Sequence, residues 1–183
     1  MSRRSSDVDA WIAAAAARAS AAVAELLQGA APLPLGTGAR QIDPDDLAEE
    51  VLCPEVWSAA VVSRLKGVAS GSAGLLLSDA LVRSLLAALV GSRYETPLGE
   101  RERSALAETG NIAISAAAGA MGRTLGGVVL PSVPLLACGS FEPVLGRMLE
   151  ASSGARARAY LVDSAWSDPD GGCSLRFVWV ADA

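Results

Sequence analysis

Histidine is absent from the 183-residue chain, and lysine occurs only once, at Lys66. Without histidine, Ser-His-Asp and Cys-His catalysis, histidine proton shuttles and most zinc sites are excluded. Cysteine is scarce, and no Cys-x-x-Cys pair occurs among the three present, which are Cys53, Cys138 and Cys173. This wide spacing favours reduced thiols in a core over a disulfide framework or a metal site.

A long apolar run is also missing. No stretch approaches the ~18 residues that span a bilayer. The alanine-rich segment near the N-terminus is broken at Arg18, so it is too weak for an export signal. We therefore expect a cytoplasmic protein that does not bind a membrane. The net charge of −5 argues against a nucleic-acid binder that neutralises phosphates.

The residues that are present indicate a globular α+β protein. The chain is 51% hydrophobic and 19% charged, and its length suits one domain over residues 1–183. In the first half the pattern predicts helices at 8–28, 47–52 and 79–91, an edge strand within 31–42, and strands at 56–68 and 73–77 joined by a turn at 71–74. In the second half it predicts helices at 97–125 and 142–150, a proline-interrupted strand at 128–138, and a hairpin of 155–165 with 174–180 across a turn at 168–172.

The second half follows the order of the first. An offset of 98 residues aligns Leu47 with Leu145 and Val51 with Leu149. We therefore predict an internal duplication with repeats at about 6–91 and 97–183. Two such units most economically share one antiparallel sheet, with two long helices on one face.

A cluster of aspartates and a set of tryptophans are both explained by the fold without a ligand. Asp43, Asp45 and Asp46 resemble a cation site, but their position before an apolar run favours a helix N-terminus. The strand tryptophans, Trp57, Trp166 and Trp179, are expected in the core or on a sheet face rather than in a ligand box.

The predicted helix at 97–125 carries the polar side chains that could take part in binding or catalysis. At 100° per residue, four polar side chains fall within about 60° of one another, namely Ser104, Glu108, Asn111 and Ser115. The opposite side carries Leu106, Ile114, Ala117 and Met121, which should face the sheet. Beside the polar stripe, Gly110, Ala118 and Gly122 have little bulk, and we expect them to let another protein approach closely.

This stretch resembles a known motif. The run Ser104-Ala-Leu-Ala-Glu108-Thr-Gly-Asn111, followed by Pro131-Ser-Val-Pro134, is similar to that of the CheC/CheX/FliY family of chemotaxis phosphatases. The family motif is Asp or Ser, three residues, Glu, two residues, Asn, twenty-two residues and Pro, and every one of these spacings occurs here. The resemblance covers nearly the whole chain and implies a pseudo-twofold duplication of one unit.

The resemblance implies dephosphorylation of the phosphoaspartate on a CheY-like response regulator. Asn111 would orient the attacking water and Glu108 would pair with a lysine of the regulator, while Ser104, Ser115 and Pro134 would help to bind it. No cofactor would be bound by this chain, and Mg²⁺ would be held by the regulator.

The first helix lacks the pair, because Ala10 and Ala13 stand at the corresponding positions. We therefore expect one active site in a monomer. The alternative is a non-catalytic binding module of the same fold, for a response regulator, the deamidase CheD or the flagellar switch.

Overall fold

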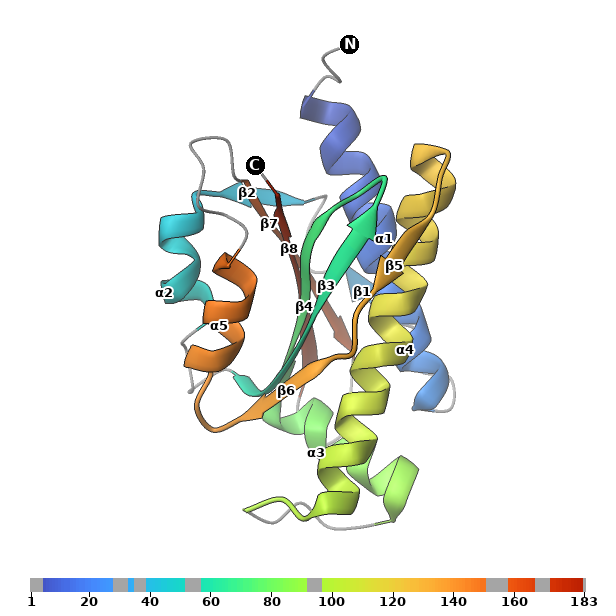
Figure 1. Ribbon diagram of the computed structural model, residues 1–183. Helices are drawn as coiled ribbons and strands as arrows, with labels where there is room; N and C mark the ends of the chain where they lie inside the picture. The colour runs from blue at the N-terminus through green and yellow to red at the C-terminus, as the bar shows by residue number, and fades with distance from the viewer. Residues whose placement is uncertain are drawn as a thin grey trace.

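The computed structural model describes residues 5–27, 33–34, 39–51, 57–91, 97–150, 158–166 and 172–182 (Figure 1). The first half contains α1 (Ser5–Leu26), β1 (Leu33–Pro34), β2 (Arg40–Ile42), a 3-10 turn (Pro44–Asp46), α2 (Leu47–Val51), β3 (Trp57–Gly67), β4 (Gly71–Ser78) and α3 (Asp79–Val90). The second half contains α4 (Glu100–Leu125), β5 (Val129–Pro131), β6 (Leu135–Cys138), α5 (Glu142–Leu149), β7 (Ala159–Trp166) and β8 (Cys173–Ala181). Residues 35–38, Cys53 and the predicted hairpin turn at 168–171 lie outside the described residues.

All strands in the described part of the chain belong to one sheet, and all their pairings are antiparallel. The strand order is β1-β7-β8-β4-β3-β5, with β2 also pairing β7 and β6 also pairing β3. The two short strands of each half therefore pair with a long strand of the other half. This exchange ties the halves into one sheet.

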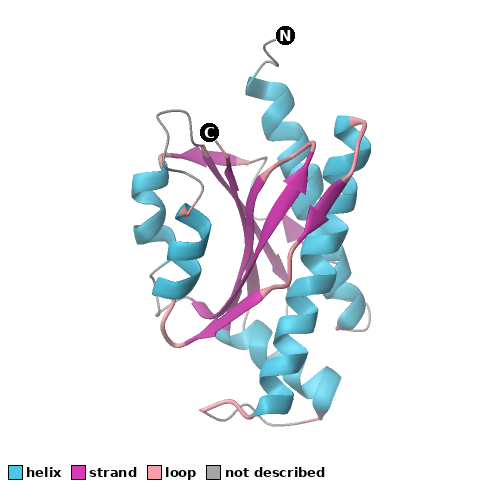
Figure 2. Ribbon diagram, in the orientation of Figure 1, coloured by secondary structure: helices cyan, strands magenta, loops and turns pink. Residues whose placement is uncertain are grey.

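Helices cover both faces of the sheet (Figure 2). The long helices α1 and α4 lie side by side on one face, and α3 closes one end of that layer. The short helices α2 and α5 cover part of the other face. Each face has its own buried cluster: Ile12, Phe177 and Ile114 belong to the larger one, and Leu47, Val144 and Met148 to the smaller one. The predicted α+β architecture, with two long helices on one face, is confirmed.

The central strand β4 explains one wrong prediction. Residues 71–74 were expected to form a turn, but they begin β4, and the turn comprises Val68, Ala69 and Ser70. Every residue of β4 is buried, because helices lie over both faces of this part of the sheet, and such a strand shows no alternation of apolar and polar residues. Gly74 lets the side chain of Met148 approach the strand, since a Cβ there would lie 2.6 Å from Met148 Cε and would displace it.

Both predicted helix starts are confirmed. Ser78 caps α3 by accepting a hydrogen bond from the Leu81 amide, and it also accepts one from the Ser174 amide of β8. Asp43 accepts from the Asp45 amide and begins the 3-10 turn ahead of α2, so the acidic cluster is a helix N-terminus.

Within the described residues no helix is both long and apolar enough to cross a membrane.

Candidate functional site

The helix α4 presents the predicted polar stripe to the surface. Ser104, Glu108 and Ser115 are exposed and Asn111 is half-buried. On the opposite side the predicted core residues are fully buried, namely Leu106, Ile114, Ala117 and Met121. The periodicity of the sequence therefore assigned the two sides of this helix correctly.

Glu108 and Asn111 lie next to each other on that stripe. The Asn111 Nδ2 atom donates to Glu108 Oε2 at 3.5 Å, a long contact that costs little to break. Both groups project from the middle of a 26-residue helix that is anchored on the sheet and on α1. A carboxylate and a carboxamide are thus held on a rigid element, with hydrogen-bonding capacity left for a partner.

The helical stripe of Asn111 continues toward the end of α4 that packs against β5. On the same helical stripe, seven and eleven residues further along, are Ala118 and Gly122, and both line a shallow groove against β5 together with Val128 and Val129. The predicted binding residue Pro134 belongs to the connection between β5 and β6 and is half-buried.

The connection that carries Pro134 is fixed to β3. The Ser132 amide donates to the Arg64 carbonyl at 2.8 Å, and the Ser132 hydroxyl accepts from the Arg64 amide at 3.0 Å. The next strand, β6, pairs Leu135 with Val62 of β3. Strand β3 also supports α4, because Gly110 of α4 packs on Val61 of β3. A common support therefore holds both the helix and the proline segment.

The small residues beside the stripe do not have the predicted role. A Cβ on Gly110 would lie 2.3 Å from Val61 Cγ1, so this glycine lets the helix approach β3 rather than another protein. Ala118 is 1% exposed and Gly122 is buried against the Gly127 carbonyl. Close packing within the molecule explains all three, and a helical projection alone could not distinguish this from packing against a partner.

A shallow depression of about 610 Å³ lies between the start of α4 and the end of α3. Its walls include Ser104 and Glu108 of the predicted site, together with Arg101 and Val90. Arg101 was not among the predicted residues, although its position seven residues before Glu108 places it on the same stripe. Ser115 and Pro134 do not line this depression.

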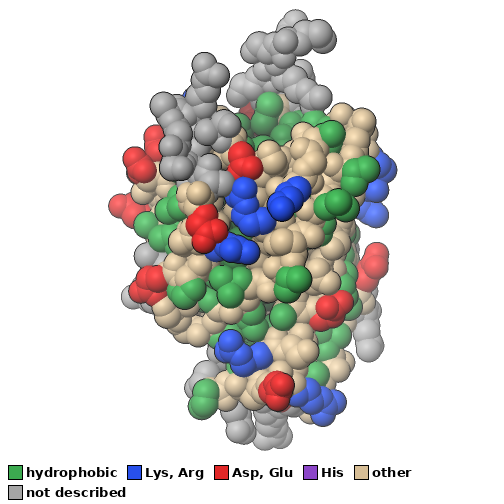
Figure 3. All heavy atoms as spheres, in the orientation of Figure 1, with side chains coloured by type: hydrophobic (Ala, Val, Ile, Leu, Met, Phe, Trp, Pro, Cys, Tyr) green, Lys and Arg blue, Asp and Glu red, His purple; other side chains and the backbone are tan. Residues whose placement is uncertain are grey.

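The other groups near the predicted site residues in the sequence are one thiol and two exposed apolar side chains. Burial raises the pKa of the Cys138 thiol in β6, and the positive charge of Arg103 opposes this rise. Ile112, beside Asn111, is 38% exposed, and Val133, beside Pro134, is 86% exposed. In Figure 3 hydrophobic side chains are visible over β5 and β6. Within the described residues no group of histidine, cysteine and acidic side chains could hold a metal ion.

The corresponding face of α1 is bare. Ala10 is exposed and Ala13 is half-buried, like Glu108 and Asn111 at an offset of 98 residues. Neither alanine side chain can form a hydrogen bond, so the described part of α1 offers no second pair at these positions.

The chain has the fold of the CheC, CheX and FliY chemotaxis proteins. FliY of Thermotoga maritima superposes with a TM-score of 0.67 at 16% identity, covering 100% of this chain and 93% of FliY. A CheC-like superfamily protein from Shewanella sp. PV-4 gives 0.58 at 12% identity, covering 89% and 94%. The FliM middle domain from H. pylori gives 0.57 at 8% identity, covering 95% and 90%. In sequence, no family model and no curated protein matches the chain.

Proposed function

We propose that the protein is a phosphatase that hydrolyses the phosphoaspartate of a CheY-like response regulator. The observation that carries this proposal is the exposed Glu108–Asn111 pair on α4, in which the carboxamide nitrogen lies 3.5 Å from the carboxylate. The spacing of Ser104, Glu108, Asn111 and Pro134 matches the motif of the CheC/CheX/FliY phosphatases, and the fold is the one those proteins share.

The chemistry needs little from this chain. An acyl phosphate is already reactive, so holding a water molecule in line with phosphorus accelerates the reaction without a nucleophile or a strong base. The water oxygen forms a bond to phosphorus as the bond to the aspartyl oxygen breaks, which yields the free carboxylate and inorganic phosphate. Asn111 suits this role, because its amide can donate to a phosphoryl oxygen and accept from water without adding negative charge.

Glu108 has a docking role in this proposal. Its carboxylate is exposed and its contact to Asn111 is long, so both groups can exchange that contact for groups of the regulator. A lysine beside the phosphoaspartate would pair with Glu108, and a charge pair that loses water as two proteins close is worth more than an exposed one. The apolar side chains of Ile112 and Val133, which follow Asn111 and precede Pro134 in the sequence, are exposed and would add contact area.

Phosphate release tests the proposal directly. The purified protein should accelerate loss of phosphate from a Mg²⁺-loaded, phosphorylated CheY-like regulator. The affinity for the same regulator activated with beryllofluoride should be measured alongside. If the regulator binds tightly and its loss of phosphate is not accelerated, the protein is a binding module without catalytic activity.

The alternative is a binding module without catalysis. The FliM middle domain has the same fold, and another structure with this fold comes from a FliM–SpeE complex. On α1 the corresponding positions, Ala10 and Ala13, carry no polar side chain, so a helix at this place in the fold can lack the pair. The intact pair on α4 favours the phosphatase, since a purely structural face does not need a carboxamide three residues after a carboxylate.

A further inference from the structure

Arg101 is an exposed arginine at the start of α4 that the proposed chemistry does not use. It lines the depression of about 610 Å³ between α3 and α4 together with Glu108. The two residues are seven positions apart, so they lie within about 20° of each other around the helix and about 10 Å apart along it. Glu100 also lines the depression, but it lies about 100° from Arg101 around the helix. Arg101 and Glu108 therefore place a cation and a carboxylate on one line.

Helix stability does not explain an arginine at this position. Arg101 is the second residue of α4, where the positive end of the helix dipole favours Glu100 and Glu102 and disfavours a cation. No acidic residue stands three or four positions before or after it, so no ion pair along the helix is available. Within the described residues Arg101 forms no ion pair at all, whereas five other arginines do, namely Arg40, Arg64, Arg83, Arg147 and Arg176.

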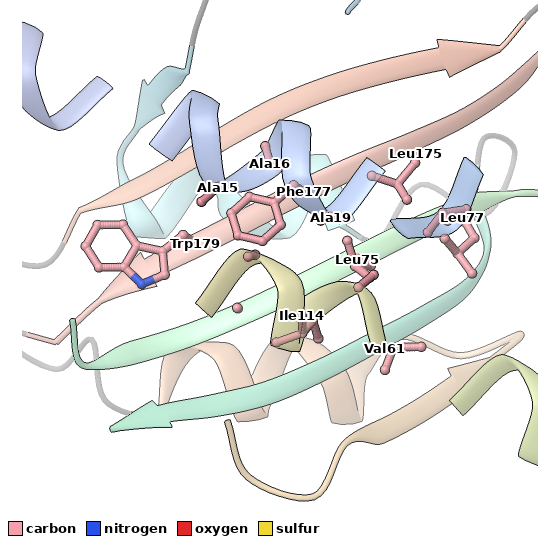
Figure 4. Close-up of a cluster of buried hydrophobic side chains, with 14 of the residues drawn as sticks. Ala15, Ala16, Ala19, Val61, Leu75, Leu77, Ile114, Leu175, Phe177 and Trp179 are labelled. Atoms are coloured by element: carbon pink, nitrogen blue, oxygen red, sulfur yellow. The ribbon is translucent and has the colours of Figure 1, made fainter. Parts of the chain in front are cut away.

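The support beneath this face of α4 is rigid. On the opposite side of the helix, Leu106 and Ile114 are fully buried. Figure 4 shows Ile114 in the buried cluster that also holds Val61 of β3 and Leu75 of β4. The helix is thus anchored on the sheet, and it cannot rotate to move Arg101 out of the depression when a partner covers it.

A regulator that docks at Glu108 would cover the depression and with it Arg101. The other walls include Val90, Ser104 and Ala105, and none of these side chains can neutralise a guanidinium group. Arginine remains protonated in proteins, and enclosing its charge without an anion is costly. A partner that binds here must therefore bring a negative group to Arg101.

We propose, as an extension of the proposed function, that Arg101 is a specificity-determining docking residue that binds a carboxylate on the surface of the regulator. This carboxylate would lie on the order of 10 Å from the lysine that pairs with Glu108. The order of the two charges fixes the direction in which α4 lies across the regulator. A regulator with a cation in place of the carboxylate is rejected by repulsion. Arg101 acts on affinity and takes no part in hydrolysis.

Charge reversal at two arginines of α4 tests this assignment. Arg103 is the matched control, because it is also exposed but stands about 140° from Glu108 around the helix, and it does not line the depression. Arg101→Glu should weaken binding of the beryllofluoride-activated regulator at least tenfold, and Arg103→Glu should alter it by less than about two-fold. Both variants change the net charge equally, and thermal unfolding verifies that both are folded.

Two conservative variants separate charge from shape. Arg101→Lys keeps the charge and should bind within about three-fold of the wild type, whereas Arg101→Gln should lose roughly three- to tenfold. The affinity of Arg101→Gln should also depend less on salt, because one charge pair is missing. In phosphate release, Arg101→Gln should raise KM and leave kcat within about two-fold of the wild type, since only binding is lost.

The outcomes distinguish this docking role from the phosphatase itself. Equal affinity of Arg101→Glu and Arg103→Glu would overturn the role of Arg101, and acceleration by the wild type would still support the phosphatase. If the wild type binds the regulator without accelerating phosphate loss, and only Arg101→Glu loses affinity, the phosphatase is wrong and the docking role stands. A wild type that binds no CheY-like regulator overturns both.

Discussion

The two long helices α1 and α4 have nearly the same environment and different chemistry. At an offset of 98 residues, Ala10–Leu27 and Glu108–Leu125 have the same degree of burial at every position except Arg18, Ala22 and Leu26. Trp11 and Thr109 are both buried, and Ala14 and Ile112 are both exposed. Where α4 carries the carboxylate of Glu108 and the carboxamide of Asn111, however, α1 has Ala10 and Ala13.

This difference separates the requirements of packing from those of function. Burial on the sheet restricts the inner positions of both helices to small or apolar side chains, whereas the exposed positions are left open to other demands. The shared pattern supports the predicted internal duplication, which we retain as a proposal. If the proposed function is correct, only α4 has kept groups that act on a partner.

Replacing the carboxamide should have the largest effect. Asn111→Ala should reduce the rate of phosphate release from the regulator about 10²–10³-fold, because loss of a group that positions a reacting water costs a few kcal/mol of barrier. Binding of the beryllofluoride-activated regulator should remain nearly unchanged. Ala13→Ser, at the matching half-buried position of α1, is the control and should keep the wild-type rate. Full activity in Asn111→Ala would remove this residue from the proposed mechanism.

Added bulk should distinguish the two exposed faces. Ser115→Trp should slow dephosphorylation at least tenfold, which is about 1.4 kcal/mol, because it obstructs the face that would dock the regulator. Ala17→Trp makes the same kind of change at the corresponding exposed position of α1 and should alter the rate by less than about two-fold. Comparable inhibition by both variants would mean that docking is not confined to α4.

A methyl group should have opposite effects at two glycines of α4. Gly110→Ala should lower the free energy of unfolding by about 1–2 kcal/mol, since overpacking against Val61 costs about 1–3 kcal/mol and exceeds the gain in helix propensity. Gly119→Ala meets only Arg123 Nη1 at 3.5 Å, so it should stabilise the protein by up to about 1 kcal/mol.

Urea unfolding of both glycine variants gives the two values. On α1 the position that matches Gly110 is Ile12, which is fully buried, so the two helices approach the sheet with very different side chains at this point. A Gly110→Ala variant as stable as the wild type would show that the helix can move away from β3 at little cost.

Removing the charge of Glu108 should have the smallest effect. Glu108→Gln should weaken both association and hydrolysis by roughly three- to tenfold, because it removes one member of an interfacial charge pair, and Glu108→Lys should be worse through repulsion. Ala10→Gln on α1 is the matched control and should change neither quantity. Affinity and rate should both be measured, since a loss of rate alone would assign Glu108 to the chemistry rather than to docking.

Much of the local structure was predictable. The helix predicted at 97–125 is α4, and the proline-interrupted strand at 128–138 is β5 and β6 with the break at 132–134. The capping residue Ser78 was identified correctly because a short polar side chain before an apolar helical repeat is a strong local signal. The roles of Ser104, Glu108, Asn111, Ser115 and Pro134 stay predictions, although the structure places the first four on one face of α4.

The misassigned positions are those whose neighbours are distant in the sequence. Gly71 and Gly74 look like turn residues, but they allow close approach of Val180 and Met148 to a strand covered on both faces. The sequence predicts that Gly110 lets a partner protein approach α4, but Val61 of the same chain occupies that space. In each case a glycine indicates a close approach of another group, and the sequence does not identify which group approaches.

The sequence by itself determined the order of the elements, their caps, the two sides of α4 and the spacing of the Glu108–Asn111 pair, because helical periodicity and capping act over a few residues. Only the tertiary structure decided that Ser132 fixes the β5–β6 connection to β3, that Gly110 packs on β3, and that Trp11, Tyr160 and Trp179 line one cleft. These contacts join segments that are far apart in the chain. They depend on which surfaces the sheet brings together, and no local pattern of residues encodes that choice.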